Sequence, residues 1–303
     1  MSAGTAGALA RLRASWQALP ANLRGAVWVL GAALALSAMG ACVKLLGSRL
    51  DSLQIAFFRS LFGLLVVVPF IHRQGGAWAV LRTRRLGALF VRAVLGVGAM
   101  LASFYALTRL PLADAVTLAF TQPLFSIPLA AIVLHETIRA PRWIATACGF
   151  AGVTIMVGPS GAEYGVAALV GIAGAFLVAC VRIMVKQLSA TERPLTILVW
   201  FGVFSTLLSL APALAVWQAP SAGDYVLLAL VGALAAGAQT LIIWGLRAGE
   251  ASAVVPFEYS RLLFAAGFGY LIFGDLPGVA TLAGAAVIVA SSVFLGRAEL
   301  RAR

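Results

Sequence analysis

The chain has 303 residues, of which 62% are hydrophobic and 11% are charged. Soluble globular proteins are roughly 45–50% apolar and about 25% charged, so this composition excludes an ordinary soluble enzyme or nucleic-acid-binding domain and indicates an integral membrane protein. The formal charge of +12 would suggest a nucleic-acid partner for a soluble protein. For this chain we expect the lipid bilayer as the surrounding partner and no nucleic acid.

The sequence carries no motif for catalysis or metal binding. Cys42, Cys148 and Cys180 lie in apolar segments without paired spacing and predict small buried residues rather than disulfides or a zinc site. There is no P-loop and no H-E-x-x-H, and Gly96-Val97-Gly98 is too short for a dinucleotide fingerprint. We therefore expect no enzyme activity, no metal and no cofactor; a membrane enzyme or a receptor is the alternative from a different class.

Ten apolar runs, separated by Gly and Pro residues, predict an all-α membrane protein with ten transmembrane helices, because about 20 apolar residues cross a bilayer. The runs lie at 25–47, 53–72, 86–107, 113–133, 141–158, 164–185, 195–217, 223–246, 252–273 and 278–296. Short cytoplasmic loops accumulate Lys and Arg, and these residues fall in both tails and in every second loop, whereas the opposite side holds only Arg49 and Arg109. Both termini are therefore expected in the cytoplasm, for a multi-pass protein of the bacterial inner membrane.

An internal repeat relates the two halves of the chain. Ala41-Cys42-Val43-Lys44 recurs 138 positions later as Ala179-Cys180-Val181-Arg182, and Arg109 with Ala113 to Val116 aligns with Arg247 and Ala251 to Val254. The pattern predicts a cytoplasmic tail (1–24), a first five-helix unit (25–158), a periplasmic linker (159–163), a second five-helix unit (164–296) and a cytoplasmic tail (297–303). Because five is odd, the second unit would be inverted in the membrane, as in many secondary transporters.

On these residues the chain resembles the drug/metabolite transporter superfamily, specifically its ten-helix EamA-type carriers. The resemblance covers about residues 25 to 296 and rests on the start of the fourth span (Ala113 to Val116), on Pro123 within it, on Leu134-His135-Glu136 after it, and on Gly149 to Val153. In the second half Arg261 stands where the repeat puts Pro123, and Asp275 replaces the usual Glu. The resemblance implies export or exchange of small metabolites, amino acids and aromatic amino acids among them.

The fourth and ninth spans combine proline with polar residues, and we expect both helices to be irregular. The fourth span carries Gln122-Pro123 and Pro128. The ninth span carries Pro256, Glu258, Ser260 and Arg261. Proline removes a backbone hydrogen bond and kinks a helix, and paired irregular helices in corresponding repeat positions point to a substrate site. Prolines are also common in membrane helices without any such role.

Charged side chains in the spans have two interpretations each. Glu258 and Arg261 share a helical face at i,i+3, either toward a substrate or as a structural ion pair. Lys44 and Arg182 are repeat mates near span ends, where they would anchor by snorkelling or contact an anionic substrate. Arg59 and Arg92 lie within two turns of their span ends, so snorkelling is the expectation for them too.

Aromatic and amide side chains supply the other predicted substrate contacts: Tyr105, Gln122, Gln239, Trp244 and Tyr259. An apolar cavity with a few placed polar groups suits an amino acid with a bulky side chain. Trp28, Trp143 and Trp217, near span ends, are instead expected in interfacial belts.

The fifth and tenth spans carry small residues four apart, at Ala145 and Gly149 and at Ala280 and Gly284. This spacing lets helices approach closely, so we expect these spans to join the two units; homodimerisation through the same surfaces is the alternative, and the protein is expected as a monomer or a homodimer.

Together these features predict a secondary transporter that works by alternating access around a midplane cavity. The expected cargo is an amino acid, aromatic or otherwise hydrophobic, that is exported or exchanged. The alternative is a carrier of nucleotide-like or other anionic metabolites, which would use Lys44, Arg182 and Arg261 as anion contacts.

Overall fold

The computed structural model describes residues 19–73, 81–133, 140–157, 162–188, 191–248 and 255–300. Within these ranges all regular structure is helical. In chain order the elements are α2 (Ala21–Leu46), α3 (Ser52–Arg73), α5 (Leu86–Arg109), α6 (Leu112–Ala119), α7 (Gln122–Val133), α8 (Ala140–Val157), α9 (Ala162–Leu188), α10 (Pro194–Ala215), α11 (Ala222–Ala248), η1 (Val255–Tyr259), α13 (Ser260–Phe268), η2 (Gly269–Phe273) and α14 (Val279–Leu300).

The all-helical membrane fold expected from the sequence is confirmed, and each predicted span overlaps one helix or one interrupted helix. Among the described residues, 6 helices are long and apolar enough to cross a membrane by length and composition, and Ser52–Val68 and Val279–Ser291 are shorter apolar helices. The count of ten spans, the cytoplasmic termini and the boundaries of the two units stay predictions.

Proline sets the boundary between α5 and α6. Pro111 has a fixed φ and no N–H, so it ends one helix and begins the next. Leu110 turns to an extended conformation while its N–H still bonds to the carbonyl of Ala106 at 2.9 Å. α6 then begins directly, which leaves almost no loop between the two helices.

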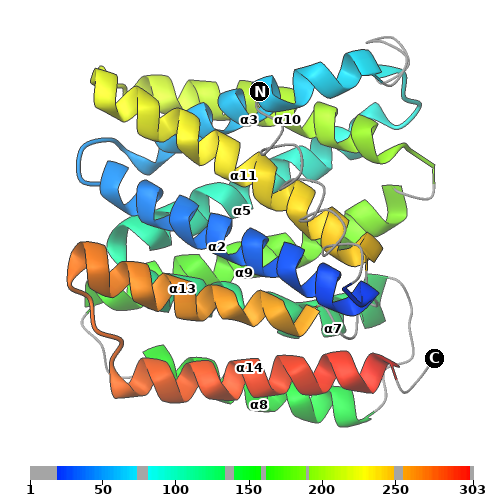
Figure 1. Cartoon of the computed structure of the whole chain (residues 1–303), viewed down its shortest axis with the longest axis vertical. Coiled ribbons are helices and arrows are strands. Elements are labelled where there is room, and N and C mark those ends of the chain that lie inside the picture. Colours follow the sequence, from blue (N-terminus) through cyan, green and yellow to red (C-terminus); the bar gives the residue numbers. More distant parts are fainter. Residues whose placement is uncertain are drawn as a thin grey trace, which may run out of the picture.

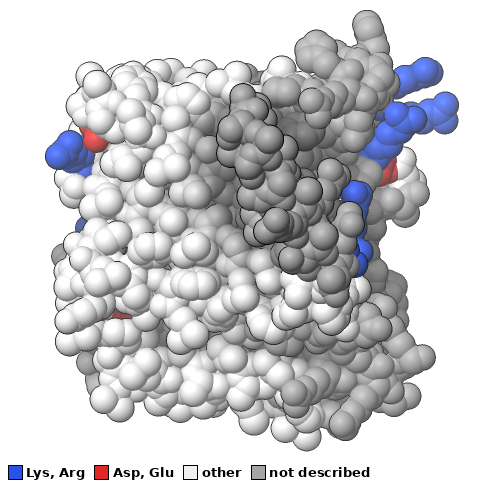
Figure 2. Space-filling model, in the orientation of Figure 1, with Lys and Arg blue, Asp and Glu red and all other residues white. Residues whose placement is uncertain are grey.

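The helices lie side by side across the view of Figure 1, stacked along the long axis of the molecule. α3, α10 and α11 lie at one end of the stack, α2, α5, α9 and α13 in the middle, and α8 pairs with α14 at the other end. On the face in Figure 2 the described charged side chains gather toward the two margins where helices end, and the described surface between them is uncharged. This is the surface expected of a protein that spans a bilayer.

The helix contacts repeat between the two halves of the chain. The contact of α2 with α11 has a counterpart in α9 with α5, that of α2 with α13 in α9 with α7, and that of α11 with α3 in α5 with α10. The remaining large contacts, α3 with α10 and α8 with α14, pair equivalent helices. A pseudo-two-fold axis between the halves would produce this pattern; the inverted orientation itself stays a prediction.

The close approach of α8 and α14 involves a different glycine from the one expected. A Cβ on Gly152 would lie 3.0 Å from the Gly284 carbonyl oxygen, so these two backbones touch, whereas a Cβ on Gly149 would lie 2.5 Å from the Leu124 side chain of α7. Cys148, expected to be buried, is exposed on α8. Gly149 thus packs toward its own half of the chain, and Gly152 toward the other half.

Candidate functional site

The fourth predicted span is interrupted between α6 and α7. Phe120 and Thr121 form a turn, in which the Phe120 N–H bonds to the Thr117 carbonyl at 3.0 Å and the Thr121 N–H to the Leu118 carbonyl at 3.0 Å. The Thr121 hydroxyl also donates to the Leu118 carbonyl at 2.7 Å. Backbone groups released inside a membrane helix need partners, and these tight bonds supply them. The predicted irregularity of this span is confirmed.

The ninth predicted span is also irregular. It runs as the 3₁₀ helix η1, the α-helix α13 and the π-helix η2 in succession. It ends at Gly274, whose φ of 71° is available to glycine at little steric cost. The Gly274 N–H bonds to the Tyr270 carbonyl and the Asp275 N–H to the Gly269 carbonyl, both at 3.0 Å, as in a glycine-terminated helix.

The two irregular helices meet at their irregular points. The Phe120 ring lies against the Tyr259 ring, at the η1–α13 junction, with centroids 5.1 Å apart and planes tilted by 42°. Beside Phe120, Gln122 is buried, and its Nε2 lies 3.4 Å from Ser126 Oγ. The two halves of the chain therefore meet at this half-buried ring pair, next along the chain to the buried Gln122.

Charged groups flank this ring pair. Glu258 interacts electrostatically with Arg261 on its own segment and with Arg182 on α9, but the described residues show no ion pair between Glu258 and Arg261 within 4.0 Å. Of the two interpretations of this i,i+3 spacing, the described residues therefore do not show the close structural ion pair. The backbone carbonyl of Arg261 accepts a 2.9 Å bond from Ser37 Oγ on α2, while its Nε is buried without a hydrogen-bond partner in the described part of the chain.

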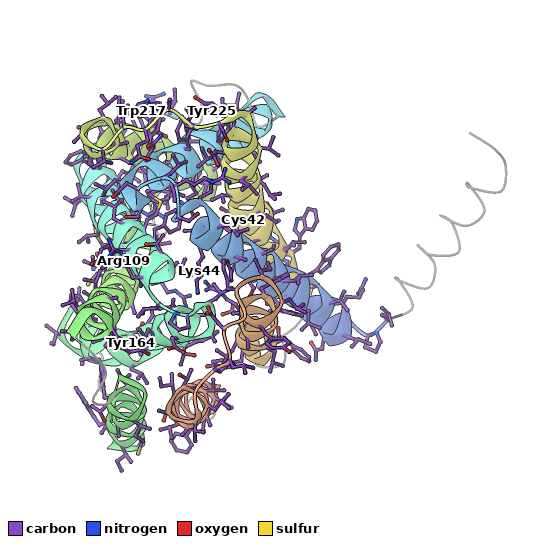
Figure 3. The ribbon with its side chains drawn as sticks, turned by 90° about the vertical axis from the view of Figure 1, so that its left-hand side faces the viewer. Cys42, Lys44, Arg109, Tyr164, Trp217 and Tyr225 are labelled. Carbon is purple, nitrogen blue, oxygen red and sulfur yellow. The ribbon has the colours of Figure 1, made fainter. Side chains whose placement is uncertain are left out.

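Lys44 differs from its repeat mate Arg182. Lys44 forms an ion pair with Asp275 and lies 4.6 Å from the centroid of the Phe273 ring, so it is a paired charge in this structure. Arg182 is exposed. In the view of Figure 3, along the helices, Lys44 lies near the middle of the bundle, and Arg109 and Tyr164 lie toward one side of it.

The other predicted substrate contacts, Tyr105, Gln239 and Trp244, have different surroundings. Tyr105 is half-buried with the Arg109 guanidinium 5.5 Å from its ring centroid. Gln239 is exposed, and Trp244 is exposed with its ring edge-to-face against Trp28 at 5.1 Å. Trp244 therefore packs at the contact of α2 with α11. Tyr259 instead contacts Phe120, and Glu258 interacts with Arg182 and Arg261.

The sequence prediction also missed a buried carboxylate at the start of α6. Asp114 is only 5% exposed, its Oδ2 accepts a 2.8 Å bond from the Tyr164 hydroxyl on α9, and its Oδ1 has no partner among the described residues. The signal was present in the sequence, since a lone Asp follows Pro111-Leu112-Ala113 in an otherwise apolar helix. It lies in the first turn, where a carboxylate also favours the helix dipole.

Arg59 and Arg92 do not snorkel. Arg59 Nη1 lies 3.3 Å from the sulfur of Met100, and the Arg92 guanidinium lies 4.0 Å from the centroid of the Phe201 ring. Their Nε atoms are enclosed by protein. Both side chains therefore turn inward, against the expectation that they extend to the span ends.

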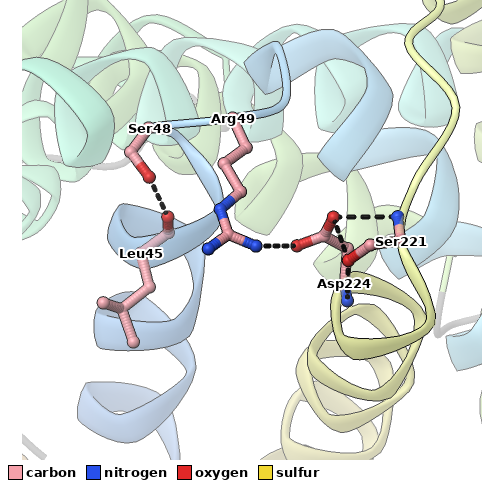
Figure 4. Close-up of polar contacts among 5 residues, drawn as sticks. All are labelled: Leu45, Ser48, Arg49, Ser221 and Asp224. Carbon is pink, nitrogen blue, oxygen red and sulfur yellow. Dashed lines mark hydrogen bonds and ion pairs between the residues drawn. The ribbon is translucent and has the colours of Figure 1, made fainter.

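At the helix ends the polar contacts are of the ordinary surface kind. Figure 4 shows Arg49 Nη1 3.5 Å from Asp224 Oδ1, with the Ser221 N–H and hydroxyl donating to Asp224 Oδ2 at 2.9 and 2.7 Å. A shallow hollow at another helix end is lined by Arg82, Thr83, Arg84, Arg85, Thr191 and Glu192. Neither group lies at the meeting point of the irregular helices.

The EamA-like transporter family matches two stretches of this chain, residues 23–158 and 165–297. Relatives include an S-adenosylmethionine uptake transporter of Rickettsia conorii, 30% identical over 94% of this chain and 96% of that protein. A riboflavin transporter of Rhizobium johnstonii is 34% identical over 91% and 92%, and the pseudopaline exporter CntI of Pseudomonas aeruginosa is 30% identical over 88% and 94%.

A solved crystal structure shares the fold, with a TM-score of 0.64 at 17% identity, covering 92% of this chain and 98% of that one. The family and these relatives are transporters and not enzymes. The chain therefore belongs to the EamA-like transporter family and is a multi-pass membrane transporter of small molecules.

Proposed function

We propose that this transporter carries a small metabolite with a flat ring and an amino-acid-like or anionic end, through a site where the α6–α7 turn meets the η1–α13 junction. The observation that supports this proposal most directly is the contact between the Phe120 and Tyr259 rings, whose centroids lie 5.1 Å apart between two irregular helices. Aromatic rings stack on flat ligands, and discontinuous helices at repeat interfaces are typical substrate sites of transporters.

The charges beside the rings suit a zwitterion. A guanidinium such as that of Arg261 binds a carboxylate, and the Glu258 carboxylate can bind an ammonium group. The cargoes named for the relatives agree in part with this chemistry: S-adenosylmethionine joins an amino-acid end to a flat base, and riboflavin contains a flat fused ring. Aromatic amino acids have the same two parts, which keeps them among the candidates.

A second candidate is an anionic metabolite without an amino group. It is favoured by the excess of cations over carboxylates beside the ring pair, where Arg182 and Arg261 both act on Glu258 among the described residues. The two candidates differ in whether the ammonium group contributes to binding.

Counterflow into liposomes tests both candidates. Liposomes that contain the purified protein are loaded with unlabelled cargo. Labelled tryptophan, S-adenosylmethionine, riboflavin, adenosine monophosphate and alanine are then added outside in turn. We expect the ring-bearing zwitterions to exchange faster than alanine. Equal exchange of alanine would contradict the role of the rings, and exchange of the nucleotide alone would establish the anionic candidate instead.

A matched pair of variants links the exchange to the site. Phe120→Leu removes the ring that faces Tyr259, whereas Phe125→Leu, on α7, removes a ring that packs against Phe150 and Phe176. We expect only Phe120→Leu to lower the apparent affinity for the ring-bearing cargo, at equal amounts of protein in the membrane. Equal losses would mean that ring packing in general, and not this site, limits transport.

We further propose that both termini lie in the cytoplasm and that the halves are inverted, as the loop charges indicate. A reporter at Gly161 is then expected to show the periplasm and one after Arg303 the cytoplasm. The same location for both would contradict an odd number of spans between the two reporters, in the second half of the chain.

A further inference from the structure

Two arginines in the body of the bundle are not used by the proposed cargo site. Arg59 lies in α3 and Arg92 in α5, each about 10 Å of helix rise from the start of its helix. Arg59 contacts Met100, and Arg92 stacks on Phe201 of α10. Both side chains lie deep among α3, α5 and α10, yet each keeps part of its surface exposed. Neither side chain is therefore fully enclosed by the described residues.

Their guanidinium groups lack hydrogen-bond acceptors. Arg59 Nε and both Nε and Nη1 of Arg92 are buried with no partner in the described part of the chain. A methionine sulfur is a weak acceptor, so the contact with Met100 does little to satisfy the hydrogen-bond donors of Arg59. Leaving a buried donor unsatisfied costs about 1–3 kcal/mol, and more for a charged group.

No described carboxylate neutralises the two arginines. Each carboxylate whose side chain is described has another partner: Asp51 with the Leu53 N–H, Asp114 with Tyr164, Glu192 with Thr83, Asp224 with Ser221 and Arg49, Glu258 with Arg182 and Arg261, and Asp275 with Lys44. Arg59 and Arg92 are moreover within electrostatic range of each other, so they repel.

The surroundings of Arg92 fix the direction of its guanidinium. One helical turn along α5, Gly96 leaves room for the Phe201 ring, since a Cβ there would lie 2.6 Å from Phe201 Cε2. The ring can thus approach α5 and hold the Arg92 guanidinium against its face. Cation–π contact orients a guanidinium while leaving its N–H edge free.

We propose that Arg59 and Arg92 form an anion-binding site among α3, α5 and α10, for a ligand that bears a phosphate or carboxylate group. Oxyanions match the forked donors of arginine, and such charge-assisted bonds are about twice as strong as neutral ones. One oxyanion between the two groups would satisfy the orphan donors and cancel the repulsion. The site is separate from the cargo site and is tested by binding, so failure of either proposal leaves the other standing.

The anion can come from solution or from a phospholipid headgroup, and thermal unfolding of purified, delipidated protein separates these sources. Inorganic phosphate is titrated into chloride buffer with wild type, Arg59→Gln and Arg92→Gln. The matched control is Arg247→Gln, which changes an exposed arginine at the end of α11. We expect phosphate to raise the Tm of wild type and of the control by about 2–4 °C in a saturable way, and to leave both other variants unchanged.

In chloride alone, Arg59→Gln and Arg92→Gln are expected to melt above wild type, because each removes one of two repelling, unpaired charges. If both variants instead melt below wild type by the same amount with and without phosphate, the arginines are packing residues and the proposal is wrong. Arg59→Lys keeps the charge but loses the fork, and is expected to bind phosphate more weakly than wild type.

Lipid retention identifies the source. Mass spectrometry of the protein before delipidation is expected to find a phospholipid retained by wild type and lost from both glutamine variants if the occupant is a headgroup. If no lipid is retained but phosphate raises the Tm, the occupant is a free anion. If wild type, like the glutamine variants, neither retains lipid nor responds to phosphate, the proposed anion-binding site is wrong.

Discussion

Charges at the ends of the helices and charges inside the bundle are arranged differently in this protein. At the ends, Lys44 is paired with Asp275. Inside, Arg59, Arg92 and Arg261 each bury an Nε atom that has no partner among the described residues. Insertion of an arginine at the centre of a membrane helix costs about 2.5–3.5 kcal/mol, so such residues are expected only where they are used. The ion pair joins distant segments of the chain, whereas the donor atoms without partners can bond to a ligand.

The largest effect is expected inside the bundle, at Glu258. This carboxylate is the described negative charge that acts on both Arg182 and Arg261. Glu258→Gln leaves Arg261 as an uncompensated buried cation, and we expect at least about a tenfold loss of exchange. The double variant Glu258→Gln with Arg261→Gln should lose more, because in the proposed site Arg261 binds the cargo carboxylate and Glu258 its ammonium group.

Counterflow and gradient-driven uptake in liposomes measure this effect. A double variant that loses less than the single one would show that Arg261 is a structural partner of Glu258 and not a cargo contact. Proton-driven accumulation that disappears in Glu258→Gln while exchange survives would make Glu258 the coupling residue.

The next effect concerns the paired charges. Lys44→Ala breaks the ion pair with Asp275, whose side chain is 29% exposed and can be solvated. We expect a destabilisation of about 1.5 kcal/mol, the lower end for hydrogen bonds to charged groups, seen as a fall of roughly 3–6 °C in Tm. Exchanging the charges in Lys44→Asp with Asp275→Lys should restore much of the loss. A swap no better than either single variant would mean that the contact with Phe273, and not the charge pair, stabilises this end.

The sequence predicted the helices far better than the site. Apolar runs bounded by Gly and Pro determine where membrane helices begin and end, and the prolines at Pro123 and Pro256 correctly predicted the two irregular spans. Side-chain direction is decided by tertiary packing. The prediction that Arg59 and Arg92 snorkel was wrong, because their guanidinium groups contact Met100 and Phe201 inside the bundle. No pattern in a single sequence encodes such contacts between distant residues.

The same limit explains why the contacts between residues at the site were not predicted. Spacing alone placed Glu258 and Arg261 on one face, but it could not show that Phe120 meets Tyr259, or that Lys44 meets Asp275 from 231 positions away. The repeat suggested that the first and sixth spans are equivalent. It could not show that one of two equivalent cations is paired while the other is exposed.

A smaller effect is expected for the ring pair. Aromatic pairs contribute about 0.5–1.5 kcal/mol beyond area burial, so Phe120→Leu and Tyr259→Leu should each lower the apparent affinity for ring-bearing cargo about two- to tenfold. If both rings hold the same ligand, the double variant should lose less than the two single losses combined. Additive losses, measured by counterflow at several cargo concentrations, would indicate that the rings act separately.

The smallest effect is expected at the exposed ion pair of Figure 4. Arg49 is 69% exposed against 8% for Asp224, and Asp224 keeps its bonds from Ser221 when Arg49 is changed. Such pairs contribute little and are screened by salt, so Arg49→Gln should leave Tm within about 1 °C of wild type at low salt and identical to it at high salt. Asp224→Asn should destabilise more, because it weakens the cap at the start of α11. If Arg49→Gln were as damaging as Lys44→Ala, exposure would not distinguish the two ion pairs. The contrast between the ends and the interior would then have to rest on the unpaired arginines alone.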